Sequence, residues 1–141
     1  MAAKGAALKP FVVDASVAAA WLLPDEDKQD AESALSLLES EDALVPDLFW
    51  QEMRNILITA ERRHRIAGAD VLACLIRLES LPLRTIFDDD HPTVIRLARK
   101  HQLSAYDAAY LALALAQAVP LAAVDVKLKR AAEAERLQPR A

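Results

Sequence analysis

Hydrophobic and polar residues alternate along this chain in blocks that predict short strands separated by helices. Short apolar runs predict strands at Phe11–Val13, Ala43–Val45, Leu83–Phe87 and Leu121–Val124. Apolar residues at helical spacing predict the intervening helices, at Ser16–Leu23, Asp27–Ser40, Asp47–Arg65, Gly68–Leu81, Pro92–His101, Ser104–Ala118 and Val126–Arg136. The alternation predicts an α/β fold, a three-layer sandwich with a central, mostly parallel sheet of four or five strands flanked by helices.

The same pattern predicts one domain. We expect it to span residues 10–136, between a flexible N-terminal segment at 1–9 and a C-terminal tail at 137–141. A chain of 141 residues is long enough to form a hydrophobic core, and 54% hydrophobic with 27% charged residues is typical of an ordered globular protein. The helix predicted at Ser104–Ala118 is apolar nearly all round, so we expect it to be buried.

Two acidic residues interrupt segments that otherwise look like core. Asp14 is the only charged residue between positions 9 and 25, and Asp107 is the only formally charged one between positions 100 and 125. Carboxylates are almost never fully buried unless they are paired or bound to a cation. These acids therefore need an explanation beyond solvation.

Four acids are predicted to meet at one edge of the sheet. Asp14 and Asp125 each follow a predicted strand, and the carboxyl ends of parallel strands share one edge. Glu52 lies beside the core-facing stripe of its helix, and Asp107 lies in the first turn of the apolar helix. A shared divalent metal explains all four, because Mg²⁺ and Mn²⁺ choose carboxylate and water ligands.

Each acid also has a simpler interpretation. Asp14 and Asp125 could each cap the helix that follows, and Asp107 could form a capping arrangement with Ser104. Glu52 could lie at the edge of the apolar stripe of its helix, with its carboxylate extending into water. For each acid alone, the simpler interpretation explains the sequence about as well as a metal site does. For all four together, it requires four unrelated reasons for acids that are predicted to meet at one edge of the sheet.

Overall charge limits the possible partners. The net charge of −4 argues against a purely electrostatic nucleic-acid binder, but not against an enzyme whose bound metal offsets local acid charge. Basic runs at 62–65, 96–101 and 127–130 suit either an RNA backbone or solvated helix ends. Asp88, Asp89 and Asp90 precede a helix opened by Pro92, so capping and solvation explain them best.

The N-terminal segment and the apolar stretches of the chain bear on its cellular location. No stretch resembles a signal peptide or is long and apolar enough to span a bilayer, so we expect a cytoplasmic protein without membrane contact.

At this level of detail the chain resembles a known family. The motifs that carry the resemblance are VVDASV, PDLFWQEMRNIL, LSAYDAAYLALA and PLAAVD. The resemblance covers roughly residues 10–136. Together they resemble a PIN domain, and more narrowly the VapC toxin ribonucleases of type II toxin–antitoxin pairs. LSAYDAAYLALA is the most specific part. One departure is Ala123, where the family often has Thr or Ser two residues before the last Asp.

The resemblance implies a metal-dependent endoribonuclease using Mg²⁺ or Mn²⁺. It implies that Asp14, Glu52 and Asp107 ligate metal directly or through water, and that Asp125 completes the acidic pocket or recruits a second ion. Ser16 matches the family's small hydroxyl residue, which would bond a metal-bound water or an active-site carboxylate. The implied partners are an RNA substrate, a cognate antitoxin and a second copy in a homodimer. A housekeeping RNA-processing nuclease and a non-catalytic, metal-stabilised binding module remain alternatives.

Overall fold

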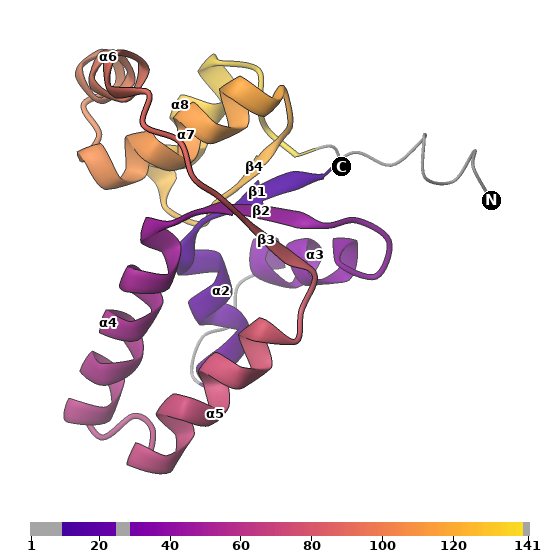
Figure 1. The fold of residues 1–141 in the computed structure, drawn as a ribbon, viewed down its shortest axis with the longest axis vertical. Coiled ribbons are helices and arrows are strands. Elements are labelled where there is room, and N and C mark those ends of the chain that lie inside the picture. Colours follow the sequence, from indigo (N-terminus) through magenta and orange to yellow (C-terminus); the bar gives the residue numbers. More distant parts are fainter. Residues whose placement is uncertain (1–9, 25–28, 140–141) are drawn as a thin grey trace.

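A single parallel sheet forms the middle of the molecule (Figure 1). The computed structural model describes residues 10–24 and 29–139. Within them, the strands follow the order β3-β2-β1-β4, and all three neighbouring pairs are parallel. The strands are β1 (Phe11–Val13), β2 (Ala43–Pro46), β3 (Leu83–Ile86) and β4 (Leu121–Ala122).

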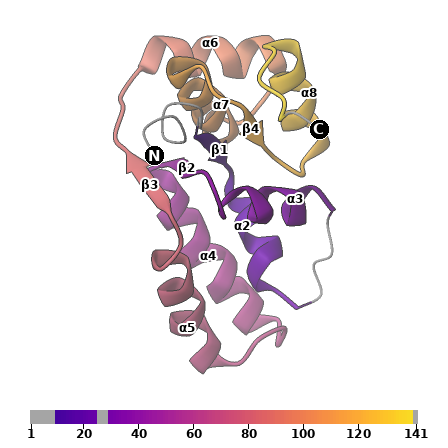
Figure 2. The same ribbon diagram turned by 90° about the vertical axis from the view of Figure 1, so that its right-hand side faces the viewer.

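Helices cover both faces of this sheet. The described residues form α2 (Ala15–Leu22), α3 (Gln29–Leu37), α4 (Leu48–Arg62), α5 (Gly68–Glu79), α6 (His91–His101), α7 (Ala105–Gln117) and α8 (Val126–Ala134). Both ribbon views place α6, α7 and α8 on one side and α2 to α5 on the other (Figure 1, Figure 2). The α4 and α5 helices run side by side and project away from the sheet (Figure 2). The predicted three-layer α/β fold is therefore confirmed.

The core is centred on β1 and α7. All three residues of β1 are buried, because β2 and β4 flank the strand and helices cover its two faces. The α7 helix contacts β1, β2 and β4, and most of its residues from Ala108 to Ala114 are buried. The prediction of a buried apolar helix here is confirmed. None of the helices that the structure describes is both long enough and apolar enough to cross a bilayer.

The strand before Asp125 is shorter than predicted. It ends at Ala122, so Ala123 and Val124 separate it from Asp125. The reason is the partner strand, since β1 ends at Val13, which pairs with Ala122, and the chain then turns into α2. The prediction that Asp125 directly follows a strand is therefore wrong by two residues.

Several helices also end before their predicted limits. The α3 helix ends at Leu37 because the next three residues form turns, and α4 ends at Arg62, two residues before His64 adopts a left-handed conformation with φ 61°.

Leu137 is buried, and its carbonyl accepts a 2.7 Å hydrogen bond from the Leu121 amide. Residues 1–9, the predicted helix start at 27–28 and residues 140–141 lie outside the described residues.

Candidate active site

Asp14 is the one charged residue that the described part of the chain buries, with a relative exposure of 4%. It caps α2, accepting a 3.1 Å hydrogen bond from the Val17 amide at Oδ1. The Ser16 hydroxyl donates to the same carboxylate, with Oγ 2.9 Å from Oδ1 and 2.8 Å from Oδ2. Burial raises the pKa of Asp14 to about 7 against these hydrogen bonds, and the charges of Asp107 and Glu52 raise it further. Asp14 is thus both a helix cap and a buried carboxyl group with a raised pKa.

Glu52 approaches the same region from the second turn of α4. It is half-buried, whereas its neighbours Gln51 and Arg54 are exposed, so its predicted position beside the core-facing stripe of the helix is confirmed. Its Oε1 accepts a 2.5 Å hydrogen bond from the Tyr110 hydroxyl. Burial raises the pKa of Glu52, the Tyr110 bond opposes this, and the charge of Asp107 adds to the rise.

Asp107 lies in the first turn of α7. Its backbone amide donates a 3.0 Å hydrogen bond to Ser104 Oγ, so this cap uses the amide of Asp107 and not its carboxyl group. Burial raises the pKa of Asp107, and the charge of Asp125 raises it further, whereas Lys127 lowers it. The carboxylate therefore has acidic neighbours and one basic neighbour.

Asp125 closes the cluster on its outer side. It is exposed and caps α8, with Oδ2 accepting a 3.0 Å hydrogen bond from the Leu128 amide. Capping is therefore a correct description of both Asp125 and Asp14, yet only Asp14 is buried. The charge of Asp125 acts on Asp107, which links it to the other acids.

The structure brings these four acids into one electrostatic group. Asp14 and Glu52 both interact with Asp107, and Asp107 interacts with Asp125. We call these four residues the acidic cluster. It gathers side chains from the end of β1, from α4, from α7 and from the turn before α8. Their roles as catalytic or metal-binding residues remain predictions.

The donor set of the acidic cluster suits a hydrated divalent cation. Across residues 10–24 and 29–139, no three Asp, Glu, His or Cys side chains are arranged to hold one ion directly. Mg²⁺ nevertheless usually keeps several waters and contacts only one or two carboxylates. The raised pKa values show that repulsion and burial disfavour the charged acids, and a cation relieves both. The fit is therefore to an ion bound partly through water.

Tyr110 belongs to this site, although sequence reasoning missed it. Its side chain is 1% exposed, and burial together with the bond to Glu52 raises the pKa of its hydroxyl. The signal was present in LSAYDAAYLALA. Tyr110 follows Asp107 by three residues, and residues at that spacing share a helix face.

The basic runs differ in their relation to the acidic cluster. Glu135 binds Lys100 at 2.8 Å and His101 at 2.7 Å, and Asp30 binds Lys129 at 2.6 Å. Lys127 instead lowers the pKa of Asp107, and its Nζ donates to the Gln102 carbonyl at 3.2 Å. Lys127 therefore has an electrostatic effect on the acidic cluster.

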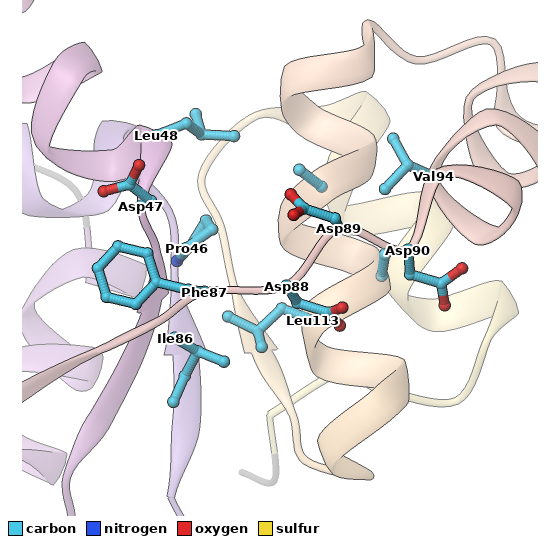
Figure 3. A pocket seen from close by; sticks show the side chains of 12 residues that line it. Pro46, Asp47, Leu48, Ile86, Phe87, Asp88, Asp89, Asp90, Val94 and Leu113 are labelled. Atoms are coloured by element: carbon cyan, nitrogen blue, oxygen red, sulfur yellow. The ribbon is translucent and has the colours of Figure 1, made fainter.

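A separate cavity of about 320 Å³ lies beyond the ends of β2 and β3 (Figure 3). Asp47, Asp88, Asp89 and Asp90 line it together with apolar residues, but no member of the acidic cluster does. Asp90 caps α6 by accepting a 3.1 Å hydrogen bond from the Thr93 amide, as capping predicted. The acidic cluster is the better site for chemistry, because it contains the buried Asp14, whose pKa is raised and whose acidic neighbours raise it further.

Comparisons with known proteins agree with this architecture. The PAE2754 protein of Pyrobaculum aerophilum is 23% identical with a TM-score of 0.70, covering 88% of this chain and 80% of that one. A chain from a toxin–antitoxin complex of Klebsiella pneumoniae is 17% identical with a TM-score of 0.54, covering 78% and 82%. The VapC20 toxin of Mycobacterium tuberculosis, described as cleaving the sarcin–ricin loop, is 15% identical with a TM-score of 0.58, covering 86% and 94%.

Sequence comparison gives the family. A search of curated proteins finds no match. The PIN domain profile, in contrast, matches residues 11–134, which includes every described strand and helix. The chain therefore belongs to the PIN domain family.

Proposed function

We propose that this protein is an endoribonuclease that hydrolyses RNA phosphodiester bonds with Mg²⁺ or Mn²⁺, and that it is the toxin of a toxin–antitoxin pair. The observation that carries the proposal is the acidic cluster around Asp14, a buried carboxyl group whose pKa is about 7 and whose acidic neighbours are Glu52 and Asp107. A strongly perturbed acid with specific charged neighbours is typical of a functional site.

The residues of the cluster have distinct roles in this proposal. Asp14, Glu52 and Asp107 hold the cation directly or through its waters, and Asp125 extends the negative field at the exposed side. Ser16 fixes the Asp14 carboxylate through its two contacts. A bound divalent ion supplies an activated water and offsets the charge on the phosphate. Lys127, whose charge lowers the pKa of Asp107, would contact an RNA phosphate.

The toxin assignment is supported by the structural neighbours. They include a toxin–antitoxin complex and a toxin that cleaves an RNA loop, although their identity to this chain is 15–17%. We therefore propose a cognate antitoxin and an RNA substrate for this protein as well. We also propose a homodimer and a cytoplasmic location, which rest on the sequence alone. Expression of the chain alone tests the biological role, since growth arrest is expected of a toxin and tolerance of a housekeeping nuclease.

A cleavage assay tests the chemistry. Purified protein is incubated with RNA and Mn²⁺ or Mg²⁺, with and without EDTA, and compared with Asp14→Asn. Asp90→Asn is the matched control, because it makes the same change at a helix N-cap outside the acidic cluster. We expect cleavage by the native protein and by the control, and loss of cleavage with EDTA or in Asp14→Asn. Equal cleavage by Asp14→Asn would refute the assignment.

A further inference from the structure

We propose that Tyr110 is a positioning residue that fixes the Glu52 carboxylate within the acidic cluster and so sets the affinity of the site for its divalent cation. The inference deepens the proposed function and rests on it. Its basis is the hydrogen bond of 2.5 Å from the Tyr110 hydroxyl to Glu52 Oε1, which joins α7 to α4 across 58 residues of sequence.

The chemical partner of this tyrosine is informative. A buried phenol needs a hydrogen-bond acceptor, and a backbone carbonyl or a neutral side chain would satisfy it. Here the acceptor is a half-buried carboxylate that also interacts with Asp107. A hydrogen bond to an ionised acceptor is stronger than one between neutral groups, so it holds the side chain more firmly. The pairing therefore stabilises one orientation of a cluster acid.

Glu52 needs such a constraint more than the other acids do. Its longer side chain has more rotatable bonds than an aspartate, and it projects from the second turn of a helix, not from a cap. Binding a cation through a freely rotating carboxylate requires that this freedom be lost on binding. The hydrogen bond from Tyr110 removes this rotational freedom before the cation binds. The bond is made to Oε1, which leaves Oε2 outside this interaction.

The element that carries Tyr110 is suited to the task. Tyr110 is 1% exposed and lies on α7, which packs against three strands of the sheet. Asp107 precedes it by one helical turn on the same helix. One buried helix therefore carries both a cluster acid and the hydroxyl that orients another. The arrangement parallels Ser16, whose hydroxyl contacts Asp14.

The test is Tyr110→Phe, which removes the hydroxyl and keeps the ring. Tyr106→Phe is the matched control, because it makes the same change on the same helix at a side chain that is 65% exposed. Mn²⁺ affinity is measured by calorimetry on the folded protein, without RNA. Loss of a group that orients a metal ligand typically weakens metal affinity 10- to 100-fold. We expect a loss of about tenfold or more in Tyr110→Phe and no change in the control.

Cleavage as a function of Mn²⁺ concentration separates positioning from simple loss of folded protein. A positioning role raises the Mn²⁺ concentration needed for half-maximal cleavage, and saturating Mn²⁺ restores most of the rate. A purely structural role lowers the rate by the same factor at every Mn²⁺ concentration. Unchanged Mn²⁺ affinity in Tyr110→Phe, together with a loss in Glu52→Gln, would overturn the proposal for Tyr110 alone. Unchanged affinity in Glu52→Gln and Asp14→Asn would instead overturn the proposed function.

A second measurement decides the case if Tyr110→Phe does not fold. The chain contains two tyrosines, so the Tyr106→Phe protein has Tyr110 as its single tyrosine. With carbon-13 at the ring carbon that bears the hydroxyl, it gives one signal from Tyr110. We expect this signal to shift with Mg²⁺ and to saturate at the same concentration as binding measured by calorimetry. Binding of Mg²⁺ without any shift of the Tyr110 signal would overturn the proposal.

Discussion

Burial of Asp14 should make the metal-free protein less stable as the pH rises. The folded protein holds the Asp14 proton up to a pKa of about 7, whereas an unperturbed aspartate releases it near 3.8. Below pH 3.8 both states are protonated and the group has no effect. Between 3.8 and about 7 the unfolded chain binds fewer protons than the folded one, so the free energy of unfolding falls with rising pH.

The size of this effect follows from the two pKa values. Each pKa unit between the folded and unfolded states corresponds to about 1.4 kcal/mol. The interval from 3.8 to about 7 therefore gives a loss of about 4 kcal/mol by pH 7, with no further change above it. This is large beside a typical total stability of about 5–15 kcal/mol. Solvent screens this carboxyl group little, because Asp14 is only 4% exposed.

Asp14→Asn removes this titration. Its amide oxygen can still accept the bond from the Val17 amide, so the cap of α2 is kept. Urea unfolding is followed by circular dichroism in EDTA from pH 4 to pH 8, and the variant is compared with the native protein at each pH. Relative to the native protein, the variant should gain about 4 kcal/mol over this range. Any constant effect of altered bonds to Ser16 cancels in the comparison.

Asp90→Asn provides a control of opposite sign. Hydrogen bonds from the Thr93 side chain and from its backbone amide lower the pKa of Asp90, so Asp90 stabilises the fold at neutral pH and loses that effect in acid. Its variant should be less stable than the native protein at neutral pH, and the difference should vanish as the pH falls. Parallel pH profiles for the native protein and Asp14→Asn would refute the reasoning about the buried carboxyl group.

Three further predictions concern the cation, Ser16 and Lys127. Addition of Mg²⁺ or Mn²⁺ at 100 times its dissociation constant should stabilise the native protein by about 2.7 kcal/mol, seen as a higher Tm; an equal gain in Asp14→Asn would place the ion elsewhere. Ser16→Ala removes a hydroxyl that lowers the pKa of Asp14. Mn²⁺ binding should therefore weaken about tenfold, and the pH at which binding is half-maximal should rise. An unchanged half-maximal pH would contradict this role of Ser16. Lys127→Ala should raise KM for RNA at low salt and reduce the salt dependence of binding by about 0.7 in the log–log slope. Lys129→Ala is its control because Lys129 pairs with Asp30, and equal effects of the two variants would exclude a specific contact by Lys127.

The layout of strands and helices could be read from the sequence, but several boundaries could not. The periodicity of apolar residues predicts where an element lies, since it records which face is buried. The length of β4 depends on β1, whose last residue Val13 pairs with Ala122, and such a partner is invisible in the local pattern. The end of α4 likewise involves a left-handed His64, where neither Gly nor Pro gives a signal.

The site was predictable to the extent that its residues looked out of place. Asp14 and Asp107 are charged residues in apolar segments, so their sequence context predicts a special environment. Tyr110 looks like an ordinary core residue of a buried helix, and its partner Glu52 lies 58 residues away. Only the folded structure, which brings the Tyr110 hydroxyl to the Glu52 carboxylate, reveals that the two side chains form one unit.

Location of bound Mn²⁺ tests the central claim most directly. Anomalous scattering from a crystal soaked in MnCl₂ would show the position of the ion without reference to activity. We predict a peak among Asp14, Glu52 and Asp107, with ligands that include water, and its absence from crystals of Asp14→Asn. A peak only at the cavity lined by Asp88, Asp89 and Asp90, or none at the acidic cluster, would contradict the assignment of this site.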